Sequence, residues 1–151
     1  MRTDIYIQTK TKNPAVQKTA QARWLIYYVS SNGQTVSKDG IVAISNATSK
    51  RAALQSLSDA LSRFNKAAVI KIYISDDYVR NMCLTQMPKR WKANDWHKIR
   101  QNGELKPCDL WQNVSKLLSN HAVSFATGAE CSGSYKLKEL EDRLNGVKRM
   151  L

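Results

Sequence analysis

The order of apolar segments in the chain predicts an α/β domain, built on a five-stranded mixed β-sheet flanked by α-helices. Three strand patterns come first, and Asn32-Gly33, a dipeptide typical of tight turns between antiparallel strands, joins the second to the third. A helical pattern then separates the third strand from a fourth. A crossover of that length is typical of parallel neighbours, so both strand directions are expected in one sheet.

The first half of the chain contains the strands that define the centre of this sheet. The first three strand patterns occupy residues 4–9, 23–30 and 35–44. In the first, Ile5 and Ile7 alternate with Tyr6 and Gln8, as in a strand buried on one face. The segment between the first two strands is polar and basic and is expected to be a link. The third strand is expected to bend around Gly40.

The following segment has the spacing of an amphipathic helix. Thr48 and Ser49 are the two expected capping residues, because hydroxyl side chains accept hydrogen bonds from the first turn of a helix. The apolar positions that repeat along one face of this helix are Ala53, Leu54, Leu57, Leu61 and Phe64. The chain then returns to a strand pattern over residues 66–74.

The second half alternates helices with one short strand. A helix is expected directly after the fourth strand, with Tyr78, Val79 and Met82 facing inward. A basic excursion with two tryptophans follows, and Pro107 and Asp109 are expected to open the next helix. The remaining patterns are a helix over 110–118, a strand over 123–126 and a helical tail from 135 with Leu137, Leu140, Leu144 and Val147 on one face. That tail is expected to pack on the sheet, although a dimerising seam is the alternative.

The composition is that of one globular domain spanning residues 1–151. No apolar run approaches the roughly 18 residues that a membrane span needs, and the first residues lack a signal-peptide pattern, so a cytoplasmic protein without membrane contact is expected. Cys83, Cys108 and Cys131 are odd in number and are expected to be reduced thiols. With only two histidines, a zinc site is not expected, and neither is any other cofactor.

The charge balance predicts a polyanionic partner. Lysine and arginine number 24 against 12 acidic residues, which leaves a formal charge of +12. Such a field attracts nucleic acid and releases the counterions of its phosphates on binding. The cations are clustered: one group lies between Lys10 and Arg23, and another fills residues 89–100. Binding to nucleic acid is therefore expected.

Three local motifs occur in order across the second half. Tyr78-Val79-Arg80 follows the fourth strand, Trp91 and Trp96 stand among cations, and a later helix begins Asp109-Leu110-Trp111-Gln112. This arrangement resembles bacterial type-one ribonuclease H, in which a Tyr-Val helix, a cationic "handle" with spaced tryptophans and an Asp-Leu-Trp-Gln helix appear in the same order. The resemblance covers essentially the whole chain, implies the ribonuclease H-like fold, and places the handle at about residues 87–106.

The resemblance also implies an active site that this chain lacks. Family members cleave the RNA strand of an RNA–DNA hybrid with two Mg²⁺ ions held by four acidic residues. The residues of this chain at those positions are Gln8, Lys50 or Arg51, Ser75, and Lys138, and Ala129 stands where the family has a histidine. Cations there would repel Mg²⁺ and could hold a phosphate directly, so a protein without this activity is expected. A metal site relocated to Asp4, Asp76 or Asp77 is the least favoured alternative, because Asp76 has the position of a helix cap.

The residues expected to bind nucleic acid are Lys10, Lys12, Asn46, Lys50, Arg51, Lys89, Arg90, Trp91, Lys92, Trp96, Lys98 and Arg100. The resemblance implies this role for Asn46 and the handle residues, whereas Lys10 and Lys12 stand where the family has a glycine-rich turn, and Lys50 or Arg51 stands where it has an acid. For Trp91 and Trp96, stacking on nucleic acid and packing at the base of the handle are both open, and Asn46 has a turn or cap role as its alternative.

Two function classes follow from these assignments. The first is binding of an RNA–DNA hybrid or other duplex without cleavage. The second is a scaffold for a protein partner, since degenerate ribonuclease H domains act as connectors in polymerase-type assemblies and mobile elements carry such divergent copies.

Overall fold

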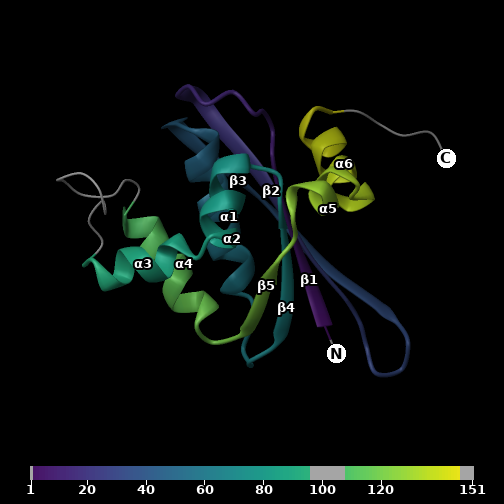
Figure 1. The fold of residues 1–151 in the computed structure, drawn as a ribbon. Coiled ribbons are helices and arrows are strands. Elements are labelled where there is room, and N and C mark those ends of the chain that lie inside the picture. Colours follow the sequence, from purple (N-terminus) through teal and green to yellow (C-terminus); the bar gives the residue numbers. More distant parts are fainter. Residues whose placement is uncertain (1, 96–107, 147–151) are drawn as a thin grey trace.

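The computed structural model describes residues 2–95 and 108–146 of the chain. A five-stranded sheet with the order β3-β2-β1-β4-β5 lies at its centre (Figure 1). The strands are β1 (Arg2–Thr9), β2 (Gln17–Val29), β3 (Thr35–Ala47), β4 (Val69–Ile74) and β5 (Ala122–Phe125). The first three are antiparallel neighbours, whereas β4 runs parallel to both β1 and β5. The predicted mixed sheet is thereby confirmed.

The hairpin of β2 and β3 is longer than the sequence indicated. β2 begins at Gln17 rather than Arg23, and Gln17 pairs with Ala47 at the far end of β3. The polar residues Lys18 and Thr19 stay exposed in this extension. Backbone pairing does not require apolar side chains, so hydropathy missed the start of the strand. β3 continues through Gly40, whose missing side chain makes room for the indole of Trp24.

The described residues form six helices, which cover the two faces of the sheet. They are α1 (Ser49–Leu61), α2 (Asp77–Leu84), α3 (Met87–Ala93), α4 (Cys108–Leu118), α5 (Gly128–Ser132) and α6 (Tyr135–Leu144). Figure 1 shows α1 to α4 on one side of the sheet and α5 with α6 on the other. None of the helices in the described ranges is long and apolar enough to cross a membrane.

The core on the α1 side is the larger one. Leu54, Leu57 and Leu61 of α1 are buried in one cluster with apolar residues of β1, β2 and β4, and Trp111 and Val114 of α4 belong to the same cluster. Thr48 is the N-cap of α1, because its hydroxyl accepts the backbone N–H of Arg51 at 3.2 Å. Of the two expected caps, the structure therefore selects Thr48. Phe64 lies beyond the end of α1 and packs, half-buried, against the same core.

The opposite face carries the C-terminal helices. Leu137 and Leu140 of α6 pack with Tyr6 and Ala126, so the predicted packing of the tail on the sheet is confirmed over α6. Val147, also assigned to that stripe, lies outside the described residues. α5 was not predicted. Its start is fixed by a capping box in which Thr127 and Glu130 each accept a backbone N–H from the other.

One inward assignment on α2 was wrong. Val79 is fully buried, but Tyr78 is 37% exposed rather than part of the core. Its ring instead lies under the Lys50 amine, with 4.3 Å from the nitrogen to the ring centroid. Met82 is half-buried and packs against the core as expected. Helical spacing identified the side of α2 that faces the core, but it did not predict that Tyr78 lies at the edge of that buried face.

Candidate functional site

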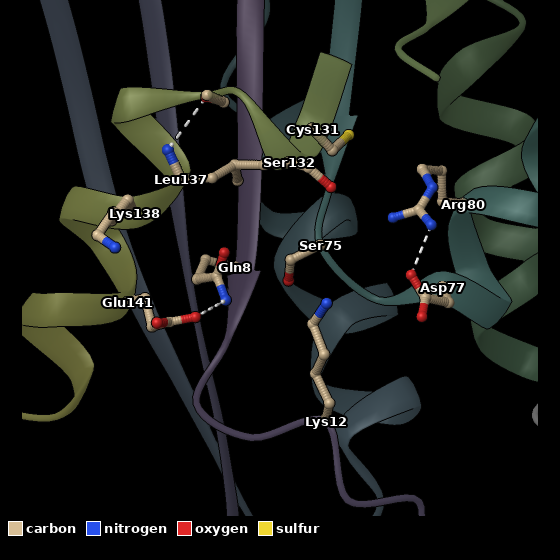
Figure 2. Close-up of a pocket in the computed structure, with 11 residues that line it drawn as sticks. Gln8, Lys12, Ser75, Asp77, Arg80, Cys131, Ser132, Leu137, Lys138 and Glu141 are labelled. Carbon is tan, nitrogen blue, oxygen red and sulfur yellow. Dashed lines mark hydrogen bonds and ion pairs between the residues drawn. The ribbon is translucent and has the colours of Figure 1, made fainter. Parts of the chain in front are cut away.

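A pocket of about 270 Å³ lies where β1 and β4 end. Because these two strands are parallel neighbours, their carboxyl ends open at the same edge of the sheet. α2 and α6 contribute the pocket's side walls. The lining residues are Gln8, Lys12, Ser75, Asp77, Arg80, Cys131, Ser132, Ser134, Leu137, Lys138 and Glu141 (Figure 2).

Gln8 and Ser75 form the floor of the pocket and are both buried, at 4% and 6% exposure. The two strand ends are tied together, since the Ser75 N–H donates to the carbonyl of Ile7 at 2.9 Å. The Thr9 N–H donates to the Ser75 hydroxyl at 3.1 Å. The Gln8 side-chain amide nitrogen donates to the Thr9 carbonyl at 2.9 Å and to the Glu141 carboxylate at 3.4 Å. The floor is thus neutral and well hydrogen-bonded.

Arg80 is fixed on the α2 side of the pocket. Its Nη1 donates to the carbonyl of Ile74 at 3.0 Å, and its Nη2 pairs with Asp77 at 2.5 Å. The side chain is only 11% exposed, and its buried Nε has no protein partner. Cys131 lines the same wall. Burial raises the pKa of the Cys131 thiol, although the backbone near Ile74 and the Arg80 guanidinium oppose that shift.

Lys12 and Lys138 bring two flexible amines to the pocket. Lys12 comes from the segment after β1, and Figure 2 shows its amine directed toward Ser75. Lys138 comes from α6, one turn before Glu141. Both lysines are exposed, in contrast to the buried floor. The pocket therefore joins a neutral floor to a positively charged rim.

With this geometry established, comparison with known proteins identifies the family. A family model described as RNase H matches residues 13–128, which is most of the chain. The chain belongs to the ribonuclease H family. Ribonuclease H of Francisella philomiragia is 29% identical over 117 residues, covering 78% of this chain and 74% of that protein. Ribonuclease H of Trichodesmium erythraeum is 27% identical over 79 residues, and the match covers 52% of this chain and 50% of that protein. The chain thus spans about half the length of several curated relatives that it matches.

Solved structures agree on the ribonuclease H-like fold. LC9-RNase H1, a type 1 RNase H with the type 2 active-site motif, aligns with a TM-score of 0.75 at 18% identity, covering 97% of this chain and 74% of that one. A foamy viral protease-reverse transcriptase in complex with RNA/DNA hybrid aligns with a TM-score of 0.66 at 13% identity, covering 94% of this chain and 19% of that one. At these identities, the alignments establish the fold.

Three of the four positions that the ribonuclease H resemblance assigns to metal-binding acids converge on the pocket. Gln8, Ser75 and Lys138 all line it. The fourth position, Lys50 or Arg51, does not contribute to the lining. Lys50 lies over Tyr78, and Arg51 Nη2 pairs with Asp109 at 3.3 Å. Both side chains face the α2 and α4 side of the domain.

The acidic residues of the pocket fit a magnesium site poorly. Asp77 and Glu141 are its two carboxylates, and they approach from opposite walls. Asp77 is held by Arg80, and Glu141 accepts from Gln8. Within residues 2–95 and 108–146, no three His, Cys, Asp or Glu side chains gather closely enough to hold a metal ion. Mg²⁺ prefers six oxygen ligands in near-octahedral geometry, and this donor set does not offer a protein cage for it.

The alternative metal ligands have structural partners. Asp76 is the N-cap of α2, because its carboxylate accepts the Val79 N–H at 2.9 Å, as the sequence predicted. Asp4 pairs with Arg2 at 2.9 Å and lies near the start of β1, away from the pocket. Neither lines the pocket. The geometry therefore disfavours a relocated metal site built on these two carboxylates.

The described part of the handle is the helix α3. Lys89, Arg90 and Lys92 are exposed on it, as expected for cations that meet a polyanion. Trp91 points the other way, is 4% exposed and packs on Trp111 with 5.2 Å between ring centroids. Packing, rather than stacking on nucleic acid, is therefore what the structure assigns to Trp91. The remaining handle residues assigned to binding, Trp96, Lys98 and Arg100, lie outside the described residues.

The other predicted binding residues lie on the surface near the strand ends. Lys10 is exposed directly after β1, and its N–H continues the ladder to the carbonyl of Gln21 at 3.0 Å. Asn46 is exposed with a φ of 50°, a left-handed conformation that asparagine tolerates well. Asn46 lies within β3, between the paired residues Ser45 and Ala47, and the cap of α1 is Thr48, so the structure assigns it a left-handed strand position rather than the expected turn or cap role. Arg80 and Glu141 were not assigned to the site: Arg80 entered only as part of the Tyr78-Val79-Arg80 motif, and Glu141 was expected on the outward face of the C-terminal helix.

Proposed function

We propose that this ribonuclease H-family protein binds nucleic acid, an RNA–DNA hybrid or another duplex, without cleaving it. One observation carries the proposal: Gln8, Ser75 and Lys138 line a single pocket at the positions where the resemblance has metal-binding acids. Two-metal cleavage needs carboxylates to hold both ions in line with the attacking and leaving oxygens. An amide, a hydroxyl and an amine do not supply that ligand field.

The positive charge supports nucleic acid as the partner. The chain carries a formal charge of +12, and Lys10, Lys12 and Lys138 are exposed around the strand ends. Exposed lysines lose little solvation when they contact a phosphate, and each contact releases condensed counterions. A reverse transcriptase with the same fold has been solved in complex with an RNA/DNA hybrid. That the present chain uses its fold in this way is part of the proposal.

Fluorescence anisotropy with matched RNA–DNA hybrid, double-stranded RNA, double-stranded DNA and single strands tests the proposal. A salt series should give steep loss of affinity, with a slope of about −0.9 per phosphate contacted on duplex DNA. The probes are analysed for cleavage after incubation with Mg²⁺ and with Mn²⁺. Intact probes with salt-steep binding are expected. Cleavage that disappears in an Asp77→Asn variant, but persists in Asp76→Asn, would refute the proposal and place a metal at Asp77.

A groove on the other side of the domain favours a second function, binding of a protein partner. This groove of about 580 Å³ lies beside β5, the edge strand of the sheet, with Leu84, Leu118 and Phe125 among its apolar residues. Lys89 and Lys92 also line it. An apolar peptide with acidic flanks has the matching chemistry. Weak binding to every nucleic acid, together with retention of one protein after nuclease treatment, would favour this function.

A further inference from the structure

The pocket at the ends of β1 and β4 holds more cations than anions. Lys12, Arg80 and Lys138 line it together with Asp77 and Glu141. Asp77 is already neutralised by its ion pair with Arg80. Glu141 accepts from the Gln8 amide and thereby keeps that nitrogen directed along the floor. Within the described residues neither lysine amine pairs with an acidic side chain, and the two lysines come from opposite ends of the chain.

Arg80 is a cation of this pocket that the protein itself holds in place. Its side chain is nearly nine-tenths buried, at 11% exposure, and is held by the Ile74 carbonyl and Asp77. Because the guanidinium is already held in place, less side-chain entropy is lost when it binds an anion. Its buried Nε–H has no partner in the protein. A buried donor without a partner is costly, so the position of Arg80 depends on the contacts of its two Nη atoms with Ile74 and Asp77.

Hydroxyl groups complete the polar lining. The Ser75 hydroxyl accepts from the Thr9 N–H at 3.1 Å and lies 3.5 Å from the Thr9 hydroxyl, so its own hydrogen can be donated either to Thr9 or to a ligand. The Ser132 side chain also lines the pocket and comes from α5, next to Cys131 (Figure 2). Arginine, lysine and hydroxyl donors around a small open pocket match the several acceptor oxygens of a phosphate group. A metal ion would be repelled by the positive charges of the lysines and the arginine.

We infer that this pocket binds one phosphate of the nucleic-acid backbone directly, through Lys12, Arg80 and Lys138, with no metal ion between protein and phosphate. The inference rests on the proposed function and adds the place on the protein where the nucleic-acid backbone is bound. In this arrangement the lysines supply the charge that metal ions supply in the cleaving relatives implied by the resemblance. Gln8 and Ser75 supply neutral hydrogen-bonding groups on the floor.

The side-chain N–H signals of Gln8 and Arg80 offer a direct test by NMR on the full chain. The probe is dimethyl phosphate, a small analogue of the backbone phosphodiester, with chloride at matched ionic strength as the blank. Saturable shifts of both signals are expected in the wild-type protein. A Lys12→Ala/Lys138→Ala variant should bind the probe at least about tenfold more weakly. Lys66→Ala, an exposed lysine before the opposite end of β4, is the control and should bind like the wild type.

The same variants are then titrated with the RNA–DNA hybrid across a salt series. Because both lysines hold one phosphate, the double variant should lower the salt slope by about 1 and not by 2. Dimethyl phosphate shifts that fail to saturate, or that are unchanged in the double variant, overturn the inference. So do saturable shifts on adding Mg²⁺, which would make the pocket a metal site.

The two proposals fail in distinguishable ways. If the hybrid binds uncut while dimethyl phosphate does not saturate, the phosphate site is refuted and the proposed function stands. If dimethyl phosphate saturates but no nucleic acid binds, the phosphate chemistry of the pocket is supported and the proposed function is refuted. Inorganic phosphate serves as a second small probe. Much tighter binding of inorganic phosphate than of dimethyl phosphate would refute a backbone phosphodiester as the ligand, in favour of a free or terminal phosphate.

Discussion

Replacing Trp91 with alanine separates the two roles that the sequence left open for this residue. In the structure its indole is 4% exposed and lies against Trp111, with ring centroids 5.2 Å apart and ring planes at 59°. Removing it leaves a cavity between α3 and α4. Large-to-small replacements of buried tryptophan cost about 3–5 kcal/mol of unfolding free energy. The tilted ring pair accounts for roughly 0.5–1.5 kcal/mol within that sum.

Urea unfolding followed by circular dichroism measures this cost. A domain of this kind has about 5–15 kcal/mol of stability in total, so Trp91→Ala should shift the midpoint strongly. Lys92→Ala is the matched control, because Lys92 is the next residue of α3 and is exposed. It should change stability by less than about 0.5 kcal/mol. If Lys92 meets nucleic acid as proposed, the control should also weaken hybrid binding.

The opposite pattern would refute the packing role. Should Trp91→Ala cost less than about 1 kcal/mol and still weaken hybrid binding, the indole would be acting outside the core. Trp111→Phe provides a second check on the pair. Trp111 is fully buried, and its indole N–H has no partner, so phenylalanine removes an unsatisfied donor. A cost below about 1.5 kcal/mol is expected for this replacement.

Three further predictions concern stability. Gly40→Ala should destabilise by about 1–3 kcal/mol in urea, because an added Cβ would lie 2.5 Å from the Trp24 ring. Thr48→Ala should cost about 0.5–2 kcal/mol and lower the melting temperature, since the N-cap of α1 is lost. Burial raises the pKa of the Cys83 thiol from 9.0 to about 12, so the folded state keeps its proton where the unfolded state has released it. Unfolding free energy should therefore fall as pH rises above 9.0, and a Cys83→Ala variant should lose that part of the pH dependence.

The sequence predicted the elements that have strong periodicity. The stripe from Ala53 to Leu61 marked α1 because a helix has to bury such a stripe against the sheet. The Asn32-Gly33 turn marked the β2–β3 hairpin, where Gly33 has a φ of 83°. The convergence of Gln8 and Ser75 was expected only from the family resemblance, and the parallel pairing of β1 with β4 brings them together. These features are local or follow from topology.

Other features depend on contacts that no single segment encodes. The burial of Trp91 requires α4 to supply the opposing ring. Arg80 becomes part of the pocket only because the Ile74 carbonyl and Asp77 hold it there. Each of these needs a partner in another element, and the sequence does not specify the distance between them.

The floor of the pocket is formed by two neutral side chains, Gln8 and Ser75, at positions where the resemblance has metal-binding acids. Carboxylates clustered at strand ends repel one another, and burial raises their energy further unless cations neutralise them. A hydroxyl at Ser75 accepts the Thr9 N–H without carrying a charge into this buried position, at 6% exposure. The Gln8 amide closes onto the Thr9 carbonyl in the same way. The strand ends are therefore satisfied by the protein's own hydrogen bonds, and the charged groups of the pocket, among them the exposed Lys12 and Lys138, lie around a neutral floor.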